Sequence, residues 1–305
     1  MYTIRDLCDL DHTLAKDYLS RFTYPWEALA GIKDLILSLG RDLDKNEYTE
    51  VSEHVWVHRT ARVFPSAYLG APCIIGPNTE VRHCAFIRGS ALVGADCVVG
   101  NSVELKNVIL FDHVQTPHYN YVGDSILGYF SHMGAGSITS NVKSDKLPVV
   151  VHGQDENIET GLKKFGAMLG DHVEVGCNSV LNPGTVIGRN CNIYPTSCVR
   201  GVLPENSIWK DNGTVIRKII PEEKREWEDI SVQTASAARQ TRVSRRPALL
   251  RLADISAIIT AGTAEAKSSL ERTPVFPLIC WRTRLLPALL PRDATHIWQD
   301  TARPR

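Results

Sequence analysis

Several features that would place the chain in a protein class are missing from its sequence. Lysine plus arginine and aspartate plus glutamate number 34 each, so the overall charge gives no reason to expect a nucleic-acid or anionic-membrane partner. No run of about 18 apolar residues occurs, which excludes a membrane-spanning helix. The amino-terminal stretch carries acidic residues where a secretory signal peptide needs an apolar run.

The eight cysteines form no C-x-x-C pair, which argues against a zinc knuckle and against a disulfide scaffold. A hydrophobic share of 43% is ordinary for a chain that buries a core. Together these absences predict a cytoplasmic protein with reduced cysteines, no membrane partner and no nucleic-acid partner.

The even overall charge hides an uneven distribution. Residues 1–224 hold 21 basic and 26 acidic side chains, whereas residues 225–305 hold 13 and 8. Twelve of the 13 basic residues after this boundary are arginine. Residues 219–305 also show no repeating pattern, so we expect an Arg-rich, poorly ordered tail there.

Apolar residues recur at helical spacing within residues 1–50. Pro25 is a suitable first residue for a second helical segment, and Gly40 is a suitable stop. We therefore expect a small helical cap at the start of the chain.

A period of six dominates residues 57–116. Every sixth residue is apolar through ten consecutive places: Val57, Val63, Leu69, Ile75, Val81, Ile87, Val93, Val99, Leu105 and Phe111. Glycine often takes the next place, where we expect a tight corner to need unusual backbone angles. The period returns at Tyr121, Leu127 and Met133, and again at Leu169, Val175, Leu181, Ile187, Ile193 and Val199.

A period of six fits neither an α-helix nor a hairpin meander and is typical of a parallel β-helix. Three hexads form one triangular coil, so nineteen hexads predict about six coils. Each inward aliphatic side chain contributes about 2 kcal/mol when buried. We expect an all-β fold over 51–218, with residues 1–50 capping one end and an insertion at 140–165 reaching over a neighbouring subunit.

Three sequence motifs resemble those of a known family: GNSVELKN at 100–107, HYNYVGDS at 118–125 and MGAGSIT at 133–139. They resemble the left-handed β-helix hexapeptide-repeat acyltransferases. Within these, they are most similar to the acetyltransferase half of bifunctional N-acetylglucosamine-1-phosphate uridyltransferase/glucosamine-1-phosphate acetyltransferase.

The resemblance covers about half of the chain. It implies a left-handed coil, acetyl-coenzyme A as co-substrate, an amino-sugar acceptor, and a homotrimer with its site between subunits. The uridyltransferase half of that family needs a glycine-rich nucleotide-binding domain. We do not expect nucleotidyl transfer, because residues 1–50 contain no such loop and are too few.

His118 lies where the strict period fails, and a neutral imidazole suits the deprotonation of an amine that attacks a thioester. The resemblance assigns His118 the role of general base. Arg88 and Lys106 lie 18 residues apart, one full coil, so we expect them to stack and to bind a sugar phosphate between them. The resembled family binds its sugar phosphate with residues at these positions.

The resemblance adds side chains around the sugar. Three residues match family positions in contact with the acceptor: Tyr121, Asn141 and Lys146. His132, however, stands where the family has an asparagine that positions the sugar, and Val142 replaces a tyrosine. These two departures imply an altered amino sugar or a lost activity.

The resemblance also places the acetyl donor. Ala135, Cys177 and Pro195 match positions that line acetyl-coenzyme A. The backbone N–H groups from Gly134 to Gly136 are expected to form an oxyanion site near the thioester carbonyl.

Two other function classes stay open. A γ-type carbonic anhydrase shares the fold, and His113 and His118 have the five-residue separation of two of its zinc ligands. No third histidine lies one coil away, so we expect no metal. A non-catalytic scaffold or regulatory protein related to sugar nucleotides is the other alternative, supported by His132. The preferred prediction is acetyl transfer from acetyl-coenzyme A to a small phosphorylated or nucleotide-linked amino sugar.

Overall fold

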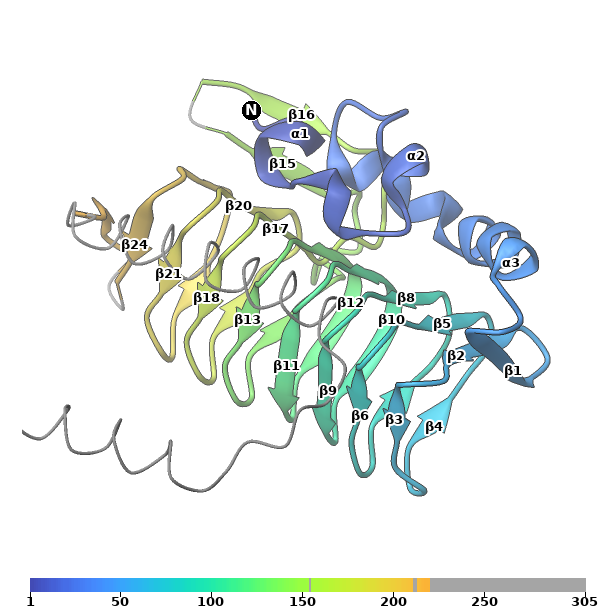
Figure 1. Cartoon of the computed structure of the whole chain (residues 1–305). Helices are drawn as coiled ribbons and strands as arrows, with labels where there is room; N and C mark the ends of the chain where they lie inside the picture. Colours follow the sequence, from blue (N-terminus) through green and yellow to red (C-terminus); the bar gives the residue numbers. More distant parts are fainter. Residues whose placement is uncertain (154, 211–212, 220–305) are drawn as a thin grey trace, which may run out of the picture. The chain divides into compact units, whose positions relative to one another are not determined.

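Residues 1–153, 155–210 and 213–219 are described by the computed structural model of the chain (Figure 1). Their repeats wind into a parallel β-helix with three faces, and successive coils add short strands to each face. The predicted fold class, an all-β left-handed parallel β-helix with a small helical segment before it, is confirmed. The tail predicted at 219–305 lies outside the described residues except for Ile219.

The strands of each face are parallel and pair with strands one coil away. The first face contains β2 (Val55–His58), β5 (Cys73–Ile75), β8 (Ala91–Val93), the second halves of β10 (Glu104–Leu110) and β12 (Tyr121–Leu127), β17 (Ala167–Leu169), β20 (Thr185–Ile187) and β23 (Val202–Leu203). The second face contains β3 (Arg62–Val63), β6 (Glu80–Val81), β9 (Val98–Asn101), β11 (Gln115–His118), β13 (His132–Met133), β18 (Glu174–Val175), β21 (Asn192–Ile193) and β24 (Ser207–Trp209). The third face contains β4 (Tyr68–Leu69), β7 (Phe86–Ile87), the first halves of β10 and β12, β14 (Ile138–Thr139), β19 (Val180–Leu181) and β22 (Cys198–Val199).

The first face has eight strands in the described part of the chain, so the β-helix has eight coils rather than about six. Part of the difference between eight and six coils comes from two corners at which the chain is one residue shorter. A strict period of six loses its register at these corners. Leu110 pairs with Val93, so Leu110 rather than Phe111 takes the inward position. Val122 pairs with Leu105, so Tyr121 lies one place before the inward position and its side chain is directed outward.

Glycines after the inward residues have a different role from the expected one. Gly76 and Gly100 have no positive φ. A Cβ atom at Gly76 would clash with the carbonyl of Gly94, and one at Gly100 would clash with that of Pro117. These glycines therefore allow the next coil to approach closely. The left-handed corner conformation falls instead on residues such as Asn78, with φ 56°.

The outer surface of the first face is also apolar. Its buried residues follow one line along the β-helix: Trp56, Ile74, Leu92, Ile109, Ile126, Met168 and Val186. Five short helices precede the repeats: α1 (Ile4–Leu7), η1 (Leu10–His12), α2 (Lys16–Leu19), η2 (Pro25–Gly31) and α3 (Ile32–Asp42). Helix α3 packs on β5, β8 and β10, and η2 packs on β12 (Figure 1). No helix in the described ranges is long and apolar enough to cross a membrane.

Strands, rather than helices, close the two ends of the β-helix. Strand β1 (Tyr48–Ser52) pairs antiparallel with β2 at the first coil, and β25 (Val215–Arg217) pairs antiparallel with β24 at the last. These strands occupy backbone groups that the terminal coils would otherwise leave unpaired. The helical segment predicted to cap one end lies instead along the side of the first face.

The insertion at 140–165 packs on its own chain. It contains a hairpin of β15 (Val150–His152) and β16 (Asn157–Glu159). The side chains of Val149, Val151 and Phe165 are fully buried, and the amino group of Met1 pairs with Glu156 at 3.7 Å. Its apolar residues anchor it to the coils beside it, and the expectation that it also reaches over a neighbouring subunit stays a prediction.

Candidate active site

One edge of the β-helix, between the second and third faces, brings together the predicted base and the predicted acetyl-coenzyme A residues. Backbone hydrogen bonds fix their order: the amide of Gly136 donates to the carbonyl of His118 (3.0 Å), that of Asn178 to Ala135 (2.8 Å), and that of Thr196, next to Pro195, to Cys177 (2.8 Å). His118, Ala135, Cys177 and Pro195 therefore stack along this edge from coil to coil. Their unequal sequence separations arise because the insertion at 140–165 lengthens one coil.

His118 ends β11, and its imidazole is exposed and makes no hydrogen bond within the described residues. An imidazole in this state is available to accept a proton from a bound acceptor. The geometry therefore permits the predicted role of His118 as a base.

Asn120, which was not predicted from the sequence, holds the backbone beside the imidazole. Its side chain is buried, and Oδ1 accepts a hydrogen bond from the amide of His118 (3.2 Å). Its Nδ2 donates to the carbonyls of Gly134 (2.8 Å) and Ser137 (3.1 Å). Asn120 is thus a positioning residue that ties the His118 corner to the turn one coil away.

The expected oxyanion site is reduced to one donor. The amide of Gly134 donates to the carbonyl of Val175 (2.7 Å), and the amide of Gly136 is used by His118. The N–H of Ala135 has no partner within the described ranges. Coil-to-coil hydrogen bonding occupies the other two groups, so only Ala135 can donate to a developing oxyanion.

Arg88 and Lys106 are neighbours on the third face, because Ile87 pairs with Leu105 in parallel register. Each cation holds a carboxylate rather than facing an open anion site. Nη1 of Arg88 lies 2.9 Å from Oε1 of Glu104, and Nζ of Lys106 lies 2.9 Å from both carboxylate oxygens of Asp124. The stacking expected from their spacing is present, and two acidic side chains balance the two charges.

Asp124 is the centre of this network and was also not predicted. The residue is buried, with 4% of its surface exposed, and φ is 49° at this corner. Besides Lys106, its carboxylate accepts hydrogen bonds from Nδ2 of Asn107 (3.0 Å) and Nδ2 of Asn141 (2.5 Å). In the sequence, the one indication of a role for Asp124 is its place in the motif HYNYVGDS.

Tyr121 lies against the same network. Its hydroxyl and Nδ2 of Asn141 fill the space where a Cβ atom of Gly123 would be, so a side chain at 123 would clash with the ring. Burial, followed by the negative charges of Asp124 and Glu104, raises the pKa of Tyr121. The phenol therefore stays protonated and can donate a hydrogen bond to an acceptor sugar.

Two predicted sugar contacts lie elsewhere in the chain. His132 is directed outward from the second face, where Nδ1 is 2.8 Å from Oε2 of Glu174. Lys146 lies exposed in the insertion with φ 59°. Within one chain, neither joins the network around Asp124.

The histidine pair of the metal-enzyme alternative is split between two edges. His113 lies at the corner between the first and second faces, where its ring stacks on Phe130 at 4.4 Å, whereas His118 lies at the next corner. In the described part of the chain, no group of three or more His, Cys, Asp or Glu side chains is placed to hold a metal ion. Within one chain, the two histidines therefore do not converge.

No protein-family model matches the chain. It is 29% identical over 154 residues to the bifunctional protein GlmU of Methanococcus vannielii, which covers 50% of this chain and 34% of that protein. It is 35% identical over 95 residues to a bifunctional sugar-1-phosphate nucleotidylyltransferase/acetyltransferase of Sulfurisphaera tokodaii, which covers 31% and 24%. The chain thus spans about a third or less of these curated relatives.

A solved structure of a hexapeptide transferase family protein from Anaplasma phagocytophilum aligns with 60% of this chain and 90% of that one. The sequence identity is 14% and the TM-score is 0.32.

Proposed function

We propose that the chain transfers an acetyl group from acetyl-coenzyme A to the amine of a small phosphorylated or nucleotide-linked amino sugar. One observation carries the proposal: His118 shares an edge with Ala135, Cys177 and Pro195, and this edge adjoins the face that carries Arg88 and Lys106. In this arrangement the base His118 would lie between the thioester, at Ala135, and the acceptor phosphate, at Arg88 and Lys106. The similarity to GlmU proteins, over 154 residues in one case, supports the same reaction.

Each step of the reaction has a residue to perform it. The acceptor reacts as its free amine: as the nitrogen forms a bond to the thioester carbon, His118 takes the proton that this nitrogen loses. The N–H of Ala135 donates a hydrogen bond to the oxyanion. The carbon–sulfur bond then breaks, the thiolate of coenzyme A leaves, and the imidazolium returns a proton to it.

The phosphate of the acceptor would displace Glu104 from Arg88, and would share Lys106 with Asp124. Tyr121 and Asn141 would donate hydrogen bonds to the sugar, because both lie in this network. We include a homotrimer in the proposal, in which His132 and Lys146 reach the site of a neighbouring copy. A cytoplasmic location fits the seven unpaired cysteines among the described residues.

One observation favours the non-catalytic alternative. Arg88 and Lys106 already have carboxylate partners, so the third face is not an empty anion site. A scaffold or regulatory protein would need no such site. This alternative predicts no release of coenzyme A with any amino sugar.

The test is acetyl transfer by the purified chain. Acetyl-coenzyme A is incubated with glucosamine-1-phosphate and with nucleotide-linked amino sugars, and free thiol is followed. We expect thiol release with at least one acceptor, and a fall of about 10²- to 10⁴-fold on His118→Ala because a general base contributes that much. His113→Ala removes a histidine from a different edge and should retain the rate. Absence of thiol release above the blank with every acceptor would favour the non-catalytic alternative.

A further inference from the structure

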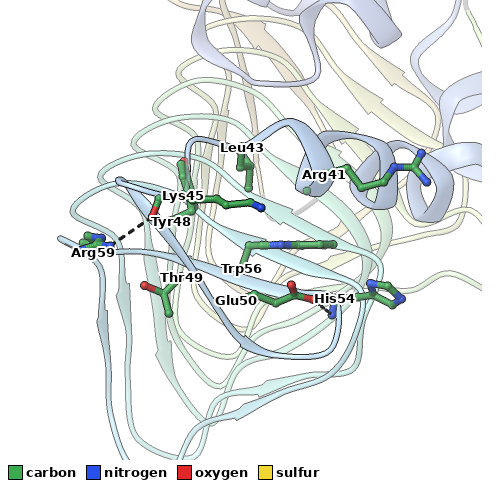
Figure 2. A pocket seen from close by; sticks show the side chains of 10 residues that line it. Arg41, Leu43, Lys45, Tyr48, Thr49, Glu50, His54, Trp56 and Arg59 are labelled. Carbon is green, nitrogen blue, oxygen red and sulfur yellow. Dashed lines mark hydrogen bonds between the residues drawn. The ribbon is translucent and has the colours of Figure 1, made fainter.

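A cavity of about 630 Å³ lies at the N-terminal end of the β-helix, and none of its lining residues belongs to the acetyl-transfer site. Figure 2 shows the side chains that line it. The end of α3, strand β1, strand β2 and the residue after β2 form its walls. Its lining is Gly40, Arg41, Leu43, Lys45, Tyr48, Thr49, Glu50, His54, Trp56 and Arg59. This volume is in the range of sites for small organic ligands and exceeds the need of a single inorganic ion.

Basic side chains dominate the ionisable groups of this cavity. Arg41, Lys45 and Arg59 form no ion pair with any described carboxylate. Figure 2 shows Arg59 on the opposite side of the cavity from Arg41. The one acidic lining residue, Glu50, already accepts a hydrogen bond from the amide of His54 at 2.7 Å. Nη2 of Arg59 donates a hydrogen bond to the carbonyl of Lys45 at 3.3 Å (Figure 2), so Arg59 has a neutral partner within the lining. The lining itself carries three basic side chains against one carboxylate.

Two mostly buried donors also line the cavity without a partner. Tyr48 is 9% exposed and Trp56 is 7% exposed. Neither the phenol of Tyr48 nor the indole N–H of Trp56 donates a hydrogen bond within the described residues. Neither polar atom is among the buried side-chain atoms that lack a partner in the described residues, so both are open to the cavity rather than enclosed. An acceptor-rich ligand would supply both partners.

Proximity to the end of α3 explains only part of this arrangement. A basic residue near a helix C-terminus, such as Arg41, interacts favourably with the helix dipole. The dipole does not account for the donors of Tyr48 and Trp56, whereas Arg59 is held by the carbonyl of Lys45. A ligand that carries several negatively charged acceptor oxygens would take hydrogen bonds from Arg41, Lys45, Tyr48 and Trp56.

We infer that this cavity binds a phosphorylated small molecule of nucleotide size, with Arg41 and Lys45 on its phosphate groups and Tyr48 and Trp56 donating hydrogen bonds. The phosphate oxygens match the excess of donors, and the rings of Tyr48 and Trp56 with Leu43 accommodate the less polar part of the ligand. The inference concerns a second site and does not depend on the proposed acetyl transfer.

The test is calorimetric titration of the purified chain with ADP, inorganic pyrophosphate and adenosine. We expect saturable binding of ADP and pyrophosphate, and none of adenosine. Lys45→Ala should weaken ADP about tenfold, and Tyr48→Phe about fivefold, because each loses one hydrogen bond to an anion. Lys33→Ala removes the same charge from an exposed position on α3 and is the matched control.

Several outcomes would overturn the inference. The first is no detectable binding of ADP at a concentration of about 1 mM, where even a weak small-molecule ligand would bind. Lys33→Ala could weaken ADP as much as Lys45→Ala, which would indicate unspecific attraction. Adenosine could bind as well as ADP, or Lys106→Met rather than Lys45→Ala could abolish binding. The last result would place ADP on the third face. Circular dichroism of each variant shows that it is folded.

Discussion

Two groups of basic side chains in this molecule differ in how their charge is balanced. On the third face, Arg88 and Lys106 each hold a carboxylate at 2.9 Å, and one of these, Asp124, is buried. At the N-terminal end, Arg41 and Lys45 line a cavity with no carboxylate partner among the described residues. A phosphate at the first group must exchange with an existing anion, whereas a phosphate at the second replaces water.

The difference shows that a pair of cations at the right spacing does not by itself make an open anion site. Asp124 is held by Lys106, Asn107 and Asn141 together, so it cannot swing away without leaving buried groups unpaired. Glu104 is half-exposed, and among the described residues its carboxylate pairs with Arg88 alone. On the third face, therefore, Arg88 is the cation more easily released to an acceptor phosphate.

The largest expected effect in this comparison is that of Asp124→Ala. Removing the carboxylate leaves the partly buried ammonium of Lys106 without its partner, and breaking a buried pair costs about 3 kcal/mol or more. We expect the free energy of unfolding, measured in urea, to fall by about this amount. Asp124→Asn keeps an acceptor for Lys106 and should cost roughly half as much. A loss below about 1 kcal/mol for the alanine variant would contradict a structural role for this network.

Much of the fold could be predicted from the sequence because every inward position requires an apolar side chain. At a corner that is one residue shorter the period breaks. There the sequence does not show which of two adjacent apolar residues points inward. Leu110 and Phe111 are both fully buried, so burial does not tell them apart. The choice depends on pairing with Val93, which is a tertiary contact.

The candidate site shows the same limit. The spacing of 18 correctly placed Arg88 beside Lys106, because it follows from the length of one coil. Asp124 lies at a shortened corner, which the period does not describe. The pairing of Glu104 with Arg88 depends on how two side chains turn across neighbouring strands. The cavity at the N-terminal end depends on how α3 meets the first coil, where Gly40 packs directly against the ring of Trp56. No local pattern encodes that contact.

An intermediate effect is expected at high pH from Tyr48, the unpaired donor of the cavity. Burial, with smaller contributions from the charges of Glu47 and Asp112, raises the pKa of Tyr48 to about 12. In the unfolded chain this phenol ionises near pH 10, so between pH 10 and 12 the folded chain binds more protons and stability falls as pH rises. Tyr48→Phe removes this contribution. Between pH 9 and 11 the free energy of unfolding of the variant should therefore fall by about 1 kcal/mol less than that of the parent chain.

Urea unfolding at the two pH values measures this difference. Tyr68→Phe, at a 60% exposed tyrosine of the third face, controls for the loss of a hydroxyl and should follow the parent chain. Equal losses for Tyr48→Phe and the parent would mean that the Tyr48 hydroxyl has a solvent-like environment, which would weaken the comparison between the cavity and the third face.

The smallest effect is expected from Glu104→Gln, and it separates the two ion pairs of the third face. The side chains of Arg88 and Glu104 are 48% and 35% exposed, against 25% and 5% for Lys106 and Asp124. Because solvent screens an exposed pair and long side chains lose entropy in forming it, the change in unfolding free energy should stay below about 1 kcal/mol. Raising the salt concentration should reduce it further. A loss as large as that of Asp124→Ala would mean that both pairs are structural, and Arg88 would then not be available to an acceptor phosphate.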